Sequence, residues 1–269
     1  MTFFDRVLRD VGAFAKVESA EEEVCELYGV YYASSGSDRL DLVDGRKQEV
    51  EVEIPGTQGL TLTLRQNPHI NSEPGQTGAV LWSSSVVMSG FLAQKSAVWG
   101  LHEANVIELG SGCGLVGIAL HRLGAQRVVL TDQARVMRLL TRNADLNRLV
   151  PTRRNRNQNP PTLLVTEFEW GRPPQDPCIL EYPVDLIVVS DCVYHEDVAP
   201  LLVHTLKDVC RGGRTVALVG QELRSDLVHQ VFLEGLLEAG FAVHRVPMDK
   251  ATDTCYVLYA MWLLLRTIH

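Results

Sequence analysis

The hydrophobic and polar positions in the second half of the chain follow two alternating patterns. Short apolar runs such as Val106–Leu109 predict buried strands, and longer stretches with apolar residues three and four positions apart predict amphipathic helices. The predicted strands are Val106–Leu109, Arg127–Thr131, Thr162–Phe168, Val184–Ser190, Thr215–Val219, Phe241–Val246 and Cys255–Leu265. The predicted helices are Leu115–Leu123, Gln133–Arg148, Ala199–Cys210 and Ser225–Ala239. Strands that alternate with helices indicate a parallel sheet covered on both faces.

The last two predicted strands differ from the others, because Pro247–Thr254 separates them without a helix. Seven strands that end in such a pair distinguish this layout from the six-stranded dinucleotide-binding sheet. We therefore expect an α/β fold, with a Rossmann-like seven-strand sheet, helices on both faces and a C-terminal antiparallel strand pair.

The N-terminal region has other patterns. Apolar positions in Phe3–Lys16 predict a helix, and the alternation in Glu49–Arg65, interrupted by the turn-rich Pro55–Gly59, predicts a β-hairpin. Asn67–Gly78 contains two Pro and two Gly and is predicted to be a linker. We expect residues 1–77 to form a helix and hairpin extension packed on the core, and residues 78–269 to form the main domain.

The composition is that of a globular protein, with 46% hydrophobic and 22% charged residues. A formal net charge of -8 disfavours a broad nucleic-acid surface, which depends on many Lys and Arg contacts with phosphate. No apolar core of signal-peptide type follows the charged start, and the apolar run Tyr256–Leu265 has about half the length that a bilayer requires. We expect a cytoplasmic or also nuclear monomer, without nucleic-acid or membrane partners.

The six cysteines are scattered without C-x-x-C spacing, so we expect free thiols and no metal site. The run His195–Asp197 contains residue types that bind metals, but adjacent residues rarely point at one ion. A solvated loop is the better interpretation of this run.

A glycine-rich turn, Gly110–Gly117, connects a predicted strand to a helix, and such turns let a backbone approach a ligand. Its glycines satisfy the dinucleotide pattern, and Asp132 stands where the ribose-binding acid of an NAD enzyme would stand, so the turn alone leaves two cofactors open. The turn follows a long N-terminal region, which is unusual for a dinucleotide site. Asp191-Cys192-Val193-Tyr194 follows the fourth strand, at the carboxyl edge where α/β sheets bind ligands.

Several motifs in this order resemble the seven-strand protein-lysine methyltransferases that include the methyltransferase-like 21 group and the valosin-containing-protein lysine methyltransferase. They are Gly78–Trp82, Glu108–Gly117, Thr131-Asp132, Glu169–Gly171, Ser190–Tyr194 and Gln221–Arg224. The resemblance runs from Gly78 to the end. It implies a methyltransferase fold that transfers a methyl group from S-adenosyl-L-methionine to a lysine of a protein substrate and leaves S-adenosyl-L-homocysteine.

The resemblance also implies which residues form the site. The expected cofactor-binding residues are Trp82, Glu108, Gly110, Ser111, Gly112, Asp132, Trp170 and Ser190. The glycine turn would receive the methionine part, Asp132 the ribose hydroxyls, and Trp170 would lie beside the adenine. Asp191 and Tyr194 are the expected catalytic residues: the carboxylate would hold the acceptor ammonium and then direct the lone pair of the amine, and the phenol would shape the acceptor channel.

Other interpretations remain open at this level. Asp132 and Asp191 are also good caps for following helices, Trp82 and Trp170 are also good core residues, and Tyr194 could simply pack over the sheet edge. The acceptor could instead be arginine, histidine, RNA or a small molecule, and the protein could bind the cofactor without catalysis or be an NAD-dependent oxidoreductase. Ser83 and the segment Thr166–Glu169 depart from the family pattern, so the substrate does not carry over.

Overall fold

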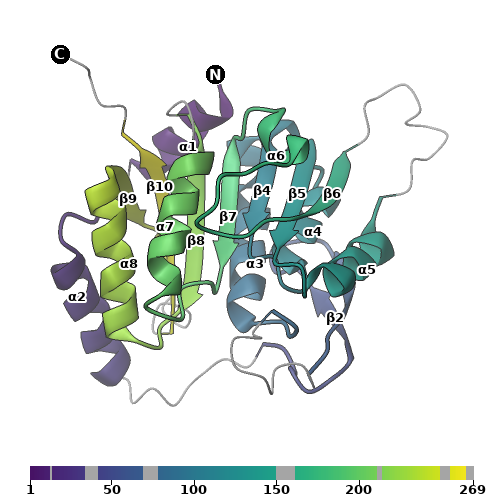
Figure 1. Ribbon diagram of the computed structural model, residues 1–269, viewed down its shortest axis with the longest axis horizontal. Coiled ribbons are helices and arrows are strands. Elements are labelled where there is room, and N and C mark those ends of the chain that lie inside the picture. The colour runs from purple at the N-terminus through teal and green to yellow at the C-terminus, as the bar shows by residue number, and fades with distance from the viewer. Residues whose placement is uncertain are drawn as a thin grey trace.

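The computed structural model describes residues 1–12, 14–33, 42–68, 78–149, 161–210, 214–248 and 255–264. Within these ranges, eight strands form one sheet in the order β1-β9-β10-β8-β7-β4-β5-β6 (Figure 1). They are β1 (Ala15–Lys16), β4 (Asn105–Leu109), β5 (Arg127–Asp132), β6 (Thr162–Glu167), β7 (Leu186–Ser190), β8 (Val216–Glu222), β9 (Phe241–Arg245) and β10 (Tyr256–Leu263). A separate hairpin pairs β2 (Glu49–Glu53) with β3 (Thr61–Arg65).

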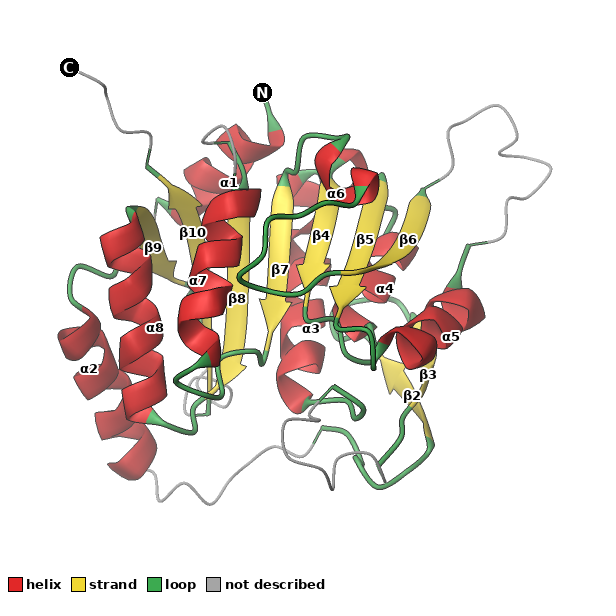
Figure 2. Cartoon of the chain, in the orientation of Figure 1, coloured by secondary structure: helices red, strands yellow, loops and turns green. Residues whose placement is uncertain are grey.

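Strands β4 to β8 are mutually parallel, whereas β10 pairs antiparallel with both β8 and β9. The arrowheads of β4, β5, β7 and β8 consequently point to one end of the sheet in Figure 2. The predicted α/β fold with a C-terminal antiparallel pair is thus confirmed. Residues 69–77 of the predicted linker and Leu265 of the last predicted strand lie outside the described residues.

Helices cover both faces of the sheet. The helices are α1 (Phe3–Val11), α2 (Ala20–Ala33), α3 (Ser83–Trp99), α4 (Leu115–Arg122), α5 (Met137–Asn147), α6 (Pro177–Leu180), α7 (Val198–Val209) and α8 (Asp226–Ala239), with a 3₁₀ turn at Leu101–Glu103. One hydrophobic cluster joins alternate sheet residues to α1, α3, α4, α5 and the hairpin, and a second joins the other sheet residues to α2, α6, α7 and α8. Both faces of the sheet are therefore buried, which explains why its strands read as continuous apolar runs.

Two helix predictions were wrong at their boundaries. The first predicted helix ends at Val11 instead of Lys16, and Ala15–Lys16 pair with β9 as an edge strand. The helix predicted from Gln133 begins at Met137, because the preceding residues form a turn at the end of β5. These boundaries depend on contacts with the sheet, which local periodicity does not contain.

Helix α2 was not predicted, and polar contacts tie it to the sheet. The Glu23 carboxylate accepts a hydrogen bond of 3.0 Å from the Tyr259 hydroxyl, which lies 3.0 Å from the His229 Nε2. Arg245 of β9 lies 3.6 Å from Glu23 and 2.6 Å from Glu26. Acidic residues of α2 thus bind groups that come from β9 and β10, and Tyr259 extends the network to His229 of α8. None of the described helices is long and apolar enough to span a membrane.

The hairpin is fastened to the core by a fully buried asparagine on α5. The Asn143 Oδ1 accepts a hydrogen bond of 2.8 Å from the Arg65 N–H, and its Nδ2 donates to the carbonyls of Arg65 at 3.0 Å and Cys113 at 2.9 Å. Asn147, one turn later, bonds the backbone of Thr63 in the same way. One side chain therefore joins the hairpin, α5 and the glycine turn.

Replacing this asparagine tests the link. Asn143→Ala removes three hydrogen bonds and leaves buried backbone groups without partners, so we expect a loss of about 3 kcal/mol in the free energy of unfolding. Urea denaturation measures it, with the exposed Thr141→Ala on the same helix as the control. A loss no larger than that of the control would show that the Asn143 hydrogen bonds do not hold the hairpin to the core.

Candidate active site

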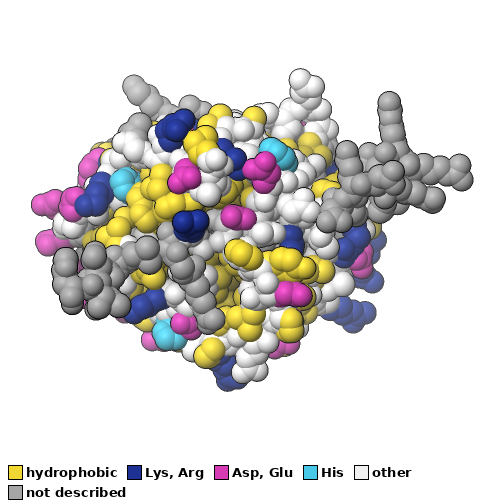
Figure 3. All heavy atoms as spheres, turned by 90° about the horizontal axis from the view of Figure 1, so that it is seen from above, with side chains coloured by type: hydrophobic (Ala, Val, Ile, Leu, Met, Phe, Trp, Pro, Cys, Tyr) yellow, Lys and Arg dark blue, Asp and Glu magenta, His cyan; other side chains and the backbone are white. Residues whose placement is uncertain are grey.

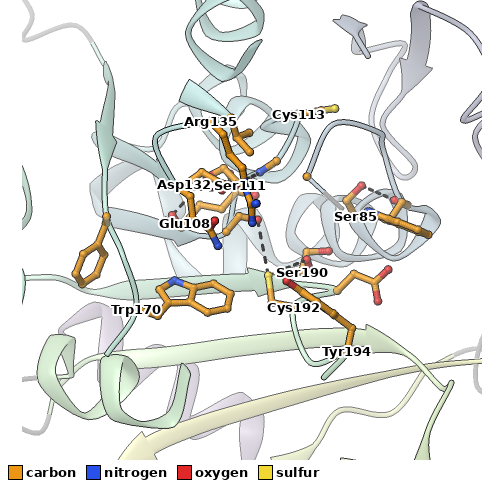
Figure 4. Close-up of a pocket in the computed structure, with 18 of the residues that line it drawn as sticks. Ser85, Glu108, Ser111, Cys113, Asp132, Arg135, Trp170, Ser190, Cys192 and Tyr194 are labelled. Atoms are coloured by element: carbon orange, nitrogen blue, oxygen red, sulfur yellow. Dashed lines mark hydrogen bonds between the residues drawn. The ribbon is translucent and has the colours of Figure 1, made fainter. Parts of the chain in front are cut away.

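A cavity of about 470 Å³ lies at the carboxyl ends of β4, β5 and β7. Its walls come from the turns that follow these strands, the loop after β6 and the start of α3, as the close-up in Figure 4 shows. Figure 3 looks from above onto the opposite end of the strands, where hydrophobic, acidic and basic side chains are interspersed. The cavity thus occupies the edge where parallel sheets bind their ligands.

The glycine turn after β4 is shaped by residues with positive φ. Gly110 has φ 67°, and a Cβ there would lie 2.6 Å from the Cys192 Sγ and 2.9 Å from a ring carbon of Trp170. Only glycine fits at this position, because both the backbone conformation and the space exclude a side chain. The Ser111 hydroxyl accepts a hydrogen bond of 3.1 Å from the Thr131 N–H, which fixes the turn to the end of β5.

Asp132 ends β5 and faces this turn. Its Oδ2 accepts a hydrogen bond of 2.7 Å from the Gly112 N–H, and its Oδ1 accepts one of 2.7 Å from the Gln133 N–H. Burial raises the pKa of Asp132, and these two backbone hydrogen bonds lower it. The alternative role as a helix cap does not apply, since α5 begins five residues later and Val136 stands at its N-cap.

Glu108 lies beneath the glycine turn and is 2% exposed. Its Oε2 accepts a hydrogen bond of 3.0 Å from the Gly117 N–H in α4. Burial raises the pKa of Glu108 to about 8, although the Gly117 hydrogen bond acts in the opposite direction. The side chain joins β4 to the first turn of α4 and also lines the cavity.

The two expected tryptophans both line the cavity, from different sides. Trp170 is half-buried after β6, with its ring edge against Gly110. Trp82 stands at the N-cap of α3 and is 37% exposed, so it is not a core residue. The guanidinium carbon of Arg224 lies 4.9 Å from the centre of the Trp82 ring. In Figure 4, Trp170 and Tyr194 lie across the cavity from Asp132 and Ser111.

Asp191 follows β7 in a left-handed conformation, with φ 59°. Its side chain is 2% exposed, and both carboxylate oxygens lie 2.6 Å from Arg224 nitrogens. The carboxylate is therefore already paired with a guanidinium, whereas from the sequence we expected it to hold the acceptor ammonium by itself. It does not cap α7, which begins at Val198 with Asp197 at the N-cap.

The other residues of the motif after β7 also lie at the cavity. Tyr194 is half-buried there, and the Ser190 Oγ lies 3.5 Å from the Ser84 Oγ. Cys192 is buried among backbone carbonyls, and burial raises the pKa of its thiol well above the usual value, so it packs as a small neutral residue. The structure thus brings all ten expected site residues to one cavity: Trp82, Glu108, Gly110, Ser111, Gly112, Asp132, Trp170, Ser190, Asp191 and Tyr194.

Sequence reasoning gave no role to Arg224, although it closes the last of the quoted motifs. Its position just after β8, the strand that neighbours β7, was the available signal. Ser85 and Arg135 also line the cavity without having been singled out. Among the described residues, no group of three or more His, Cys, Asp or Glu side chains is arranged to hold a metal ion.

A family model and several similar proteins point to one family. A family model described as lysine methyltransferase matches residues 62–238. Protein N-lysine methyltransferase METTL21A of Danio rerio is 34% identical over 178 residues, which is 65% of this chain and 73% of that protein. The Mus musculus protein of the same name is 33% identical, with coverage of 65% and 73%. EEF1A lysine methyltransferase 3 of Xenopus tropicalis is 28% identical, with coverage of 70% and 76%.

A solved structure agrees with the fold. The T. thermophilus 16S rRNA N2 G1207 methyltransferase RsmC, in complex with AdoMet and guanosine, superposes with a TM-score of 0.54 at 18% identity. The match covers 80% of this chain and 50% of that one. At this identity the likeness extends to the fold alone.

The first prediction for the site concerns Gly110. Gly110→Ala places a Cβ against Cys192 and Trp170, whereas Gly124→Ala meets nothing within 4 Å although φ there is 95°. Both variants carry the strain of a positive φ, and φ at Gly124 lies further from the left-handed region open to alanine, so a larger loss in Gly110→Ala reports the steric conflict. We expect Gly110→Ala to lose about 2 kcal/mol more of the free energy of unfolding, as measured by urea denaturation. Equal losses would mean that the turn yields without cost.

The second prediction concerns pH. The unfolded Glu108 has a pKa near 4.5, so between that pH and about 8 the folded chain retains a proton that the unfolded chain has released. The contribution of this group to the free energy of unfolding therefore falls as pH rises through that window. Glu108→Gln cannot ionise, and we expect its stability to decline less than that of the wild type between about pH 5 and about pH 8. Parallel curves from urea unfolding at several pH values would show that Glu108 titrates normally.

Proposed function

The chain belongs to the lysine methyltransferase family and is an S-adenosylmethionine-dependent protein-lysine methyltransferase. We propose that the cavity beside Asp132 binds both the cofactor and the acceptor lysine. The family and the activity expected from the sequence motifs are confirmed by the match over residues 62–238. The observation that carries the assignment of the cavity is the Asp132 carboxylate, which is held at the end of β5 by the backbone N–H of Gly112 in the glycine turn.

The residues around the cavity fit this cofactor. Each oxygen of Asp132 accepts one backbone N–H and retains a lone pair for a ribose hydroxyl. Gly110 and Gly112 would let the backbone approach the methionine part, and the Trp170 ring would offer a flat surface to the adenine. When bound, S-adenosylmethionine would supply a methyl group whose bond to sulfur breaks as the acceptor nitrogen bonds to carbon, leaving S-adenosylhomocysteine.

The chain itself has to align an amine that is not protonated. A lysine amine is mostly protonated near neutral pH, and only its free lone pair can attack. The acceptor would enter beside Trp82 and Tyr194, from the side of the cavity where the motif after β7 lies, and its proton would pass to water. Holding the amine in line is the main contribution that such a site makes to the rate.

Two features outside the cavity complete the proposal. Residues 1–77 would act as an extension packed on the domain 78–269, which is supported by the packing of α1 on α3 and by the bonds of Asn143 to β3. We also propose a monomer that acts in the cytoplasm or also in the nucleus. The net charge of -8 favours a basic segment around the target lysine, since opposite charges steer association.

The cofactor assignment is tested by calorimetric titration with S-adenosylmethionine, S-adenosylhomocysteine and NAD. We expect the first two to bind the wild type and NAD not to bind. Asp132→Ala should weaken binding at least about tenfold, because hydrogen bonds to a charged group are lost. Asp145→Ala, an exposed acid on α5, is the matched control and should change nothing. An unchanged affinity in Asp132→Ala would place the cofactor elsewhere.

The acceptor is tested in the same study with a labelled methyl group. Wild type and Tyr194→Phe are incubated with cell lysate and labelled S-adenosylmethionine, and the modified residue is identified by mass spectrometry. We expect label on lysine, at a lower rate with the variant. Label on arginine, histidine or RNA would overturn the proposed acceptor while leaving the cofactor site intact.

A further inference from the structure

The side chain of Arg224 joins three elements and contacts two residues that line the cavity, Asp191 and Trp82. Its two terminal nitrogens lie 2.6 Å from the two oxygens of Asp191, at the end of β7, and one of them lies 2.7 Å from Glu222, at the end of β8. Its guanidinium carbon lies 4.9 Å from the centre of the Trp82 ring, at the start of α3. A bidentate ion pair of this kind fixes the orientation of both side chains and compensates their charges.

This cluster is largely withdrawn from solvent. The side chain of Asp191 is 2% exposed, that of Glu222 11% and that of Arg224 28%. Two backbone N–H groups also hold the ends of β7 and β8 together. The Glu222 N–H donates to the Asp191 Oδ1 at 3.3 Å, and the Asp191 N–H donates to the Gly220 carbonyl at 2.7 Å. Two carboxylates share one guanidinium, so the cluster carries a single net negative charge.

The pairing bears on the chemistry of an amine. An unpaired carboxylate next to an acceptor lysine would raise the pKa of the amine and hold it as an ammonium ion, which has no lone pair for attack. A carboxylate that already faces a guanidinium exerts much less of this pull. The carboxylate can then orient the acceptor without trapping it in its unreactive form.

We propose that Arg224 is a positioning residue that neutralises Asp191, so that the acceptor amine is oriented at the cavity without being held as an ammonium ion. The inference rests on the proposed function of the same cavity. The proposed role predicts that an ammonium group in the acceptor channel binds more tightly when Arg224 is replaced. If Arg224 had only a structural role, its replacement would only weaken the binding of that group.

Two probes measure the effect without a known protein substrate. Both are S-adenosylmethionine analogues in which nitrogen replaces the sulfonium sulfur, and the methyl position carries an aminobutyl arm in one and a butyl arm in the other. Calorimetry gives the affinity of each probe. The ratio of the affinity of the aminobutyl probe to that of the butyl probe reports how strongly the acceptor channel binds an ammonium group. We expect Arg224→Gln to raise the ratio about tenfold, the lower end of the effect of an opposite charge. Arg224→Lys should restore most of the wild-type ratio.

Two further variants make the test specific. Arg245→Gln is the matched control, because Arg245 also pairs with two acids and is 20% exposed, but it lies on β9 and its acids, Glu23 and Glu26, do not line the cavity, whereas Asp191 does. It should leave the ratio unchanged. Glu222→Gln leaves Asp191 and Arg224 as a neutral pair, so we expect the ratio to fall below that of the wild type.

The outcomes separate the two ideas. Failure of both probes to bind the wild type would sink the proposed function itself. An unchanged ratio in Arg224→Gln, with both probes still bound, would overturn the role of Arg224 and leave the proposed function standing. If Arg224→Gln does not fold, Glu222→Gln decides the matter: a lower ratio supports the inference, and an unchanged or higher ratio overturns it.

Discussion

The hydrogen bond from the Gly112 N–H to the Asp132 carboxylate, 2.7 Å long, is the contact on which the rest of the site depends. It ties the turn after β4 to the end of β5, and the exchange between Ser111 and Thr131 reinforces it. With the turn held at the end of β5, the Glu108 carboxylate accepts the Gly117 N–H in the first turn of α4, and Gly110 lines the cavity. Three glycines of positive φ occur within five residues of this turn. Gly110 and Gly112 line the cavity, whereas a Cβ at Gly114 would meet the core residues Leu140 and Ile118.

The first part of the chain contributes to both sides of the sheet. Helix α1 and the hairpin pack on the face of α3, α4 and α5, and α2 packs on the face of α8. Asn143 connects the hairpin to the glycine turn, because its side chain hydrogen-bonds both Arg65 of the hairpin and the Cys113 carbonyl within the turn. The hairpin is therefore linked through Asn143 to a residue that lines the cavity, Cys113.

Periodicity predicted the parallel strands, since a sheet buried on both faces leaves continuous apolar runs such as Ile187–Val189 in β7. The expected site residues came from motifs whose order the topology explains, because the ends of β4, β5 and β7 meet at one edge. Helix α2 was missed because its exposed face also carries apolar residues, Val30 and Tyr32, which blur the helical period. Strand β1 was missed because two residues carry no period. The pairing of Asp191 with Arg224 joins positions far apart in sequence, so no local pattern contains it.

The left-handed backbone of Asp191 limits which substitutions at this position can be interpreted. Asparagine and aspartate tolerate such a conformation better than other residues with a Cβ. An alanine there changes the local backbone preference and removes the charge together, so its phenotype mixes two causes. Asparagine keeps the shape and the backbone preference and removes only the charge. The conformation therefore limits the residues that fit at this position independently of their charge, and a chain that carries Asn here would keep the backbone preference while losing the ion pair.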